Sequence, residues 1–227
     1  MTSIRTRLKS IQQRIDQTAM QFNRPVEDIQ LLAVSKTRPA ADIQEALAAG
    51  QQQFGESYLQ EALEKIQQLT GSNAVWHFIG RIQSNKTRTI AEHFDWVHSL
   101  YSVKHAQRLN SQRPDHLPPL KICLQINLDR EKTKGGIPPS EAAELVASIR
   151  ALPRLQLQGL MTLPALSTDF EQQRLPFRAL RELRDQLATH DLPLETLSMG
   201  MSDDLEAAIA EGATIVRIGT AIFGPRN

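Results

Sequence analysis

Short apolar segments alternate with helix-like segments along almost the whole chain, and this alternation constrains the fold more than any other feature. The segments between the apolar runs have helical periodicity, and several end at a glycine such as Gly50, Gly71 or Gly212, where helices commonly stop. Eight β-then-α units predict a closed parallel (β/α)8 barrel, because an open sheet would be expected to have fewer strands. The predicted strands are 31–36, 52–55, 75–79, 95–99, 120–127, 155–160, 195–199 and 214–218.

An amphipathic helix precedes the alternation. Ile4, Leu8, Ile11 and Ile15 recur at helical spacing, so we expect an additional N-terminal helix within residues 1–24 and the barrel over 31–224. No linker of low complexity and no break in composition interrupts the alternation. The 227 residues are therefore expected to form one α/β domain over 1–227.

Composition excludes several classes of protein. A net charge of +1 argues against a dedicated nucleic-acid binder. Cys123 is the only cysteine and lies among apolar residues, so we expect a buried, reduced strand thiol and no disulfide. The histidines lack a metal-ligand spacing, and no metal site is expected. With no apolar signal core and no membrane-length apolar run, we expect a cytoplasmic protein without membrane contact. We also expect a monomer, because no predicted helix presents an apolar face that demands a partner.

Lys36 stands where the first apolar run ends, before Pro39. In α/β proteins the carboxyl ends of parallel strands are where the chemistry lies. A lysine held among apolar groups resists protonation, and its free amine can condense with a carbonyl to form a Schiff base. The competing interpretation is a strand-end lysine whose ammonium simply reaches water.

Polar and small residues follow several of the other strands. The ends of strands 7 and 8 carry Ser198, Gly219 and Thr220, at the usual phosphate site of this architecture. Gly219 allows backbone N–H groups to approach an anion, unless it is only a turn glycine. His77 is a candidate site residue or a satisfied core histidine. We interpret Ser202 as a cap of the following helix.

Arg217 shares a strand face with Ile215 and Gly219, so it points into the barrel if that face is the interior. A guanidinium would then occupy a position that is normally apolar. The alternative is an ion pair with an acidic residue of a neighbouring strand. The charged segment 129–136 is interpreted as a solvated run.

Long motifs in one order resemble the pyridoxal phosphate homeostasis proteins of the YggS/PROSC type. They are LAVSKT (32–37), FGESYLQE (54–61), WHFIG (76–80), QSNK (83–86), GLM (159–161), LSMGMSD (197–203) and VRIGTAIFG (216–224). The resemblance implies a single TIM barrel similar to the N-terminal domain of alanine racemase, as in fold type III of pyridoxal phosphate enzymes. It also implies pyridoxal 5′-phosphate as an aldimine on Lys36.

The same resemblance implies phosphate contacts from Ser198, Gly219 and Thr220, and Arg217 near the pyridine nitrogen. Ser57 and His77 complete the expected cofactor-binding set. Ser57 stands where the family usually has asparagine, and a shorter side chain reaches less far.

The implied function is to hold pyridoxal phosphate, to buffer its free level and to deliver it to pyridoxal-phosphate-dependent apo-enzymes, without catalysis. An arginine at the pyridine nitrogen disfavours ring protonation and weakens the ring as an electron sink. Racemisation also needs two opposed bases, one of which alanine racemase takes from a second domain. The alternatives are an amino-acid racemase that uses this cofactor and a lysine Schiff-base aldolase acting on a sugar phosphate.

Overall fold

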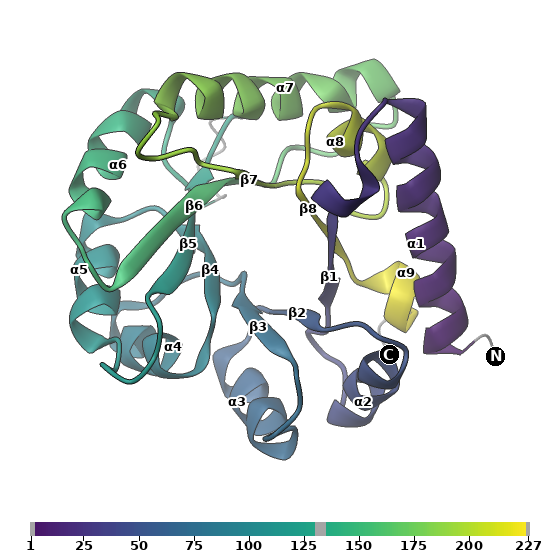
Figure 1. The fold of residues 1–227 in the computed structure, drawn as a ribbon, viewed down its shortest axis with the longest axis horizontal. Coiled ribbons are helices and arrows are strands. Elements are labelled where there is room, and N and C mark those ends of the chain that lie inside the picture. Colours follow the sequence, from purple (N-terminus) through teal and green to yellow (C-terminus); the bar gives the residue numbers. More distant parts are fainter. Residues whose placement is uncertain (1–2, 130–134, 226–227) are drawn as a thin grey trace.

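Eight parallel strands close into a barrel in the computed structural model, which describes residues 3–129 and 135–225 (Figure 1). The strands pair in chain order, and β8 pairs with β1, so the predicted TIM barrel is confirmed. Most of the charged segment 129–136 lies outside the described residues. The strands are β1 (Gln30–Val34), β2 (Gln53–Glu56), β3 (Val75–Phe78), β4 (Trp96–Leu100), β5 (Leu120–Ile126), β6 (Leu155–Thr162), β7 (Thr196–Ser198) and β8 (Ile215–Ile218).

Helices surround the barrel on its outer side (Figure 1). Gly50, Gly71 and Gly212 have φ values of 96°, 83° and 98° just beyond helices, which confirms them as stop positions. No described helix has the length and apolar character to cross a bilayer. The α-helices are α1 (Ile4–Gln21), α2 (Ala40–Ala48), α3 (Leu59–Gln68), α4 (Thr87–His93), α5 (Val103–Gln112), α6 (Ala142–Arg150), α7 (Phe170–Leu187), α8 (Leu205–Ala210) and α9 (Thr220–Phe223), with single 3-10 turns at Val26–Asp28, Ser84–Lys86 and Pro139–Glu141.

Because successive strand residues point to opposite faces of the barrel wall, the buried apolar residues form two separate clusters. The large core lies between the strands and the surrounding helices. A separate small cluster joins Trp96, Cys123 and Met161. Cys123 is fully buried, as predicted, and burial raises the pKa of its thiol.

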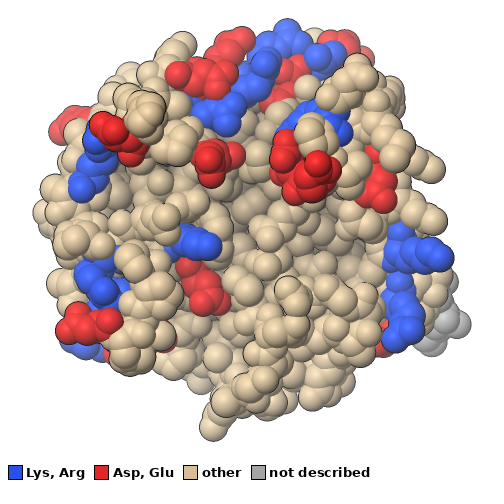
Figure 2. Space-filling model, in the orientation of Figure 1, with Lys and Arg blue, Asp and Glu red and all other residues tan. Residues whose placement is uncertain are grey.

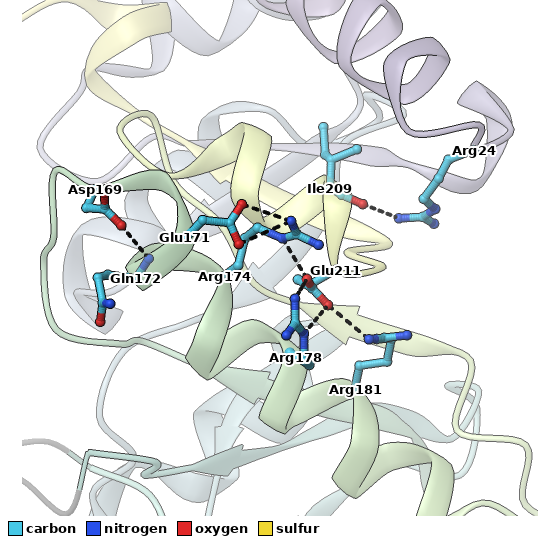
Figure 3. Close-up of polar contacts among 9 residues, drawn as sticks. All are labelled: Arg24, Asp169, Glu171, Gln172, Arg174, Arg178, Arg181, Ile209 and Glu211. Carbon is cyan, nitrogen blue, oxygen red and sulfur yellow. Dashed lines mark hydrogen bonds and ion pairs between the residues drawn. The ribbon is translucent and has the colours of Figure 1, made fainter.

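Ion pairs hold the helices around β8 together. Glu211, which follows α8, accepts hydrogen bonds from three arginines of α7 (Figure 3): from Arg174 at 2.7 Å, Arg178 at 3.0 Å and Arg181 at 2.9 Å. Arg24 donates to the carbonyl oxygen of Ile209 at 3.2 Å. On the face seen in Figure 2, basic and acidic side chains are interspersed along the top and both sides and at a few positions nearer the middle, and the lower part is largely uncharged.

The first strand is shorter than predicted. It ends at Val34 and not at Lys36, because the backbone turns at Thr37, whose φ of 64° lies in the left-handed region. Ser35 and Lys36 therefore leave the sheet and begin the loop that leads to α2. The lysine is carried on a turn at the barrel rim and not on the strand itself.

Gly159 of β6 lies where two neighbouring strands of the barrel wall approach closely. A Cβ atom at this position would lie 1.8 Å from the carbonyl oxygen of Thr196 in β7. We expect Gly159→Ala to lower the free energy of unfolding by at least about 2 kcal/mol, since the two strands must separate. The measurement is urea denaturation, with Gln158→Ala on the same strand as the control. Equal stability of the two variants would contradict the close approach.

Candidate functional site

A cavity of about 530 Å³ opens at the rim formed by the carboxyl ends of the strands, and we call it the mouth cavity. Its volume lies in the usual range for small-molecule sites. The predicted site residues Lys36, Ser57, Arg217, Gly219 and Thr220 line it. The full lining consists of Val34, Lys36, Arg38, Ser57, Ile79, Met161, Leu163, Met201, Ser202, Asp203, Arg217, Gly219, Thr220, Ala221 and Gly224.

Lys36 lines this cavity and is half-buried, while its neighbour Ser35 is fully buried. Apolar side chains, among them Val34, Ile79 and Met161, form part of the same lining. Lys36 therefore lies in a partly open cavity that a small ligand can enter. This position differs from that of a lysine on open surface, which was the competing interpretation.

One end of the mouth cavity has hydroxyl and small residues from the segments after β7 and β8: Ser202, Gly219 and Thr220. A Cβ on Gly219 would lie 3.3 Å from the carbonyl oxygen of Val34, so a side chain would crowd the cavity wall. Helix α9 begins at Thr220, and the first N–H groups of a helix have no partners within it. This end of the cavity can accept an anion.

Ser202 was missed by sequence reasoning, which assigned it to the cap of the next helix. That assignment is wrong, because α8 has Asp204 at its N-cap and no side-chain capping bond. The Asp204 carboxylate accepts a hydrogen bond from the N–H of Met201 at 2.5 Å. The signal that could have identified Ser202 is its position two residues after Gly200, in the loop that follows β7.

Arg217 reaches the floor of the mouth cavity from inside the barrel. Its guanidinium donates to the Ser198 hydroxyl at 2.8 Å and to the Thr162 carbonyl oxygen at 2.9 Å. The alternative of a direct ion pair with a neighbouring strand is wrong, since its hydrogen bonds within the described residues go to neutral oxygens. Burial lowers the pKa of Arg217 to about 10, which leaves it a cation at neutral pH.

Ser198 and His77 do not line the mouth cavity. Both are fully buried and belong to a row of hydrogen bonds inside the barrel. The Ser198 hydroxyl lies 2.8 Å from Nδ1 of His98, and Nε2 of His98 lies 2.9 Å from Nδ1 of His77. Nε2 of His77 lies 2.8 Å from the Oε1 atom of Gln53. His77 is therefore a core histidine with both ring nitrogens hydrogen-bonded, which is the second of the two interpretations given for it.

The groups at the two ends of this row determine which atom donates in each of its hydrogen bonds. Arg217 can only donate to Ser198, and the amide oxygen of Gln53 can only accept from His77. Each bond is satisfied if both imidazoles are neutral and protonated on Nε2. Burial lowers the pKa of His77 to about 3, and burial followed by the charges of His77 and Arg217 lowers that of His98 well below its usual value. The row thus holds a single cation, Arg217, at the end nearest the mouth cavity.

The mouth cavity therefore combines three kinds of group. Among the described residues it has one primary amine, that of Lys36, together with an end suited to an anion and the buried guanidinium of Arg217 between apolar walls. An amine forms covalent bonds with aldehydes and ketones. A flat, apolar ligand with a carbonyl and a phosphate group would match this set.

Comparison with known proteins agrees with this geometry. The family model described as "Alanine racemase, N-terminal domain" matches residues 6–227. A pyridoxal phosphate homeostasis protein of Pseudomonas aeruginosa is 52% identical over 227 residues, which cover 100% of this chain and 97% of that protein. The chain belongs to the pyridoxal phosphate homeostasis protein family. Membership of this family confirms the resemblance drawn from the motifs.

Solved structures of similar proteins have the same fold. PipY of Synechococcus elongatus, solved without pyridoxal phosphate, is 38% identical with a TM-score of 0.87, over 98% of this chain and 100% of that chain. PipY with pyridoxal phosphate bound is 37% identical with a TM-score of 0.84, with the same coverage of both chains. The likeness extends over the whole barrel, including the strands that line the mouth cavity.

The neutral state of His77 and His98 gives a pH prediction. In the unfolded chain a histidine has a pKa of about 6.5, so between that value and about 3 the unfolded state binds protons that folded His77 excludes. The stabilisation is complete above pH 6.5 and falls by about 1.4 kcal/mol per pH unit for each histidine as the pH falls. NMR of the ring nitrogens should show both imidazoles protonated on Nε2 and unchanged from pH 8 to 5. A midpoint near 6.5 for either ring would contradict the direction of the row.

Proposed function

We propose that this chain holds pyridoxal 5′-phosphate in the mouth cavity, through a Schiff base on Lys36, as part of intracellular homeostasis of this cofactor. The observation that carries the proposal is that Lys36 and the anion-accepting end line the same cavity together with Arg217. In the bond-forming step, the Lys36 amine adds to the aldehyde carbon and one water leaves. The aldehyde is thereby sequestered, and reversal of the step releases it to other enzymes.

Different residues of the cavity suit different parts of the ligand. The hydroxyls of Ser202 and Thr220 and the backbone at Gly219 suit the phosphate group. Arg217 suits the pyridine nitrogen, because a guanidinium has only donors and a pyridine nitrogen in its basic form is an acceptor. Ser57 lies in the same lining, and its contact with the ligand remains a prediction.

Ser198 and His77 enter the proposal in a different way from that expected from the sequence. The Ser198 hydroxyl is held between Arg217 and His98, so a direct phosphate bond would require it to leave these partners. We assign it the task of orienting Arg217 from below, with His77 one bond further along the row. Ser198 and His77 therefore affect the ligand indirectly, by orienting the guanidinium of Arg217.

The arrangement favours retention of the cofactor over its use in catalysis. Bound pyridoxal phosphate supplies an electron sink when its ring nitrogen is protonated. Arg217 is already a cation at that position and disfavours the added proton. The relatives of this chain are named as homeostasis proteins, which supports the same assignment and not the racemase or aldolase alternative.

Lys36→Ala should abolish the covalent adduct while leaving the fold intact, because Lys36 is half-buried at the rim and its loss opens no core cavity. Protein is incubated with pyridoxal phosphate, reduced with borohydride and analysed by peptide mass. The matched control is Lys104→Ala on the outer helix α5, which should retain the full adduct. A stoichiometric adduct on another residue of Lys36→Ala would contradict the assignment. An adduct of the wild type with a sugar phosphate alone would favour the aldolase.

The phosphate contacts can be tested by comparing two ligands. Ser202→Ala and Thr220→Ala should each weaken binding of pyridoxal phosphate by about 1 to 2 kcal/mol, since each removes one hydrogen bond to a charged group. Binding of pyridoxal, which lacks the phosphate, should be unchanged. Both dissociation constants are measured by titration of the absorbance of the adduct. Equal losses for the two ligands would show that these hydroxyls do not contact the phosphate.

A further inference from the structure

A buried ion pair lies outside the barrel wall, behind the turn that carries Lys36. Gly55 faces the barrel interior, so the next residue of β2, Glu56, points outward to α3. There its carboxylate lies 2.8 Å from the ammonium of Lys65. The two side chains are only 0% and 4% exposed. Neither residue lines the mouth cavity.

This pair is bonded to Ser35, the residue before Lys36, and is connected through Glu61 to Thr37, the residue after it. The Ser35 hydroxyl donates to Glu56 at 2.6 Å, and the Lys65 ammonium donates to the Ser35 carbonyl oxygen at 2.8 Å. Lys65 also donates to Glu61, one turn earlier in α3. The Glu61 carboxylate in turn accepts from the N–H of Thr37 at 2.6 Å. Lys36 thus lies between two residues, Ser35 and Thr37, that are hydrogen-bonded to side chains of α3 and β2.

The backbone at this point needs support. Thr37 is a non-glycine residue with a φ of 64°, a conformation that persists only where the surroundings impose it. The bond from its N–H to Glu61 is one such restraint. The turn formed by residues 35–37 determines the direction in which the Lys36 side chain leaves the rim.

Stability by itself is a poor explanation for the pair. Desolvation raises the pKa of Glu56, opposed by its bonds to Lys65 and Ser35, and its second oxygen has no partner within the described residues. Replacement of buried ion pairs by apolar residues of similar size is often neutral or stabilising. The bonds that these side chains make to Ser35 and, through Glu61, to Thr37 point to a geometric role instead.

We infer that Glu56, Lys65 and Glu61 are positioning residues that fix the turn around Lys36 and so direct its amine into the mouth cavity. This inference rests on the proposed function of Lys36. The three side chains act through the backbone and do not touch the ligand. Their effect should therefore be visible in the ligand-free protein as well as in the adduct.

The first test is Glu61→Ala, with Glu64→Ala as the matched control. Both glutamates lie on α3, but Glu64 is exposed and Glu61 holds Thr37. In ligand-free Glu61→Ala, amide hydrogen exchange at Thr37 should accelerate by about tenfold or more, because its acceptor is gone. The dissociation constant for pyridoxal phosphate should rise by about tenfold, and the absorbance of the adduct should shift. The control should match the wild type in every measurement, and equal behaviour of the two variants would overturn the inference.

The second test separates positioning from stability. In the double variant Glu56→Leu with Lys65→Met, the ion pair becomes an apolar pair, and we expect a thermal midpoint at or above that of Glu61→Ala. Exchange at Thr37 should nevertheless accelerate, and affinity for pyridoxal phosphate should fall. Wild-type exchange and affinity in this stable variant would overturn the inference. If the wild type formed no adduct at Lys36, the proposed function would fail, and the exchange rates would still support or overturn the anchoring of the turn.

Discussion

Closure of the barrel between its first and last strands is the constraint on which the site depends. Leu32 pairs with Arg217 and Ala33 pairs with Ile218, although these residues lie at opposite ends of the sequence. Because the two strands are parallel, the turn that carries Lys36 and the segment that begins at Gly219 leave the same rim side by side. An open sheet of the same strands would separate the amine from the anion-accepting residues.

Polar groups are buried on both sides of the barrel wall, and each set is connected to the mouth cavity. Inside, a row of neutral groups from Gln53 to Ser198 ends at the cation of Arg217. Outside, Glu56 and Lys65 bond to Ser35, and Glu61, which pairs with Lys65, bonds to Thr37. Buried polar groups are tolerated when their bonds are made. Arg217 is bonded from beneath the cavity and the turn around Lys36 is bonded from behind it, and both residues line the cavity.

The proposed role in cofactor homeostasis follows from how these groups limit chemistry. A lysine at the rim can trap an aldehyde reversibly, and an anion-accepting end adds selectivity for a phosphorylated ligand. In the proposed complex, the Arg217 cation faces the ring nitrogen and discourages the ring protonation that carbanion reactions use. Binding and release then remain as the principal reactions of the bound cofactor, which suits a protein that stores it.

The sequence by itself predicted the closed barrel, the N-terminal helix, the glycine stops and the family, because apolar periodicity and long motifs are local signals. It also placed Lys36, Gly219 and Thr220 at one rim, since parallel strands share their carboxyl ends. It misassigned Ser202 to a helix cap, placed the end of β1 too late, and did not reveal that Ser198 lies beneath the cavity. It also did not show Glu56 and Lys65 as partners of Ser35. Only the tertiary structure decided these points, because they depend on how strands and helices distant in sequence pack around one turn, and no local pattern encodes that packing.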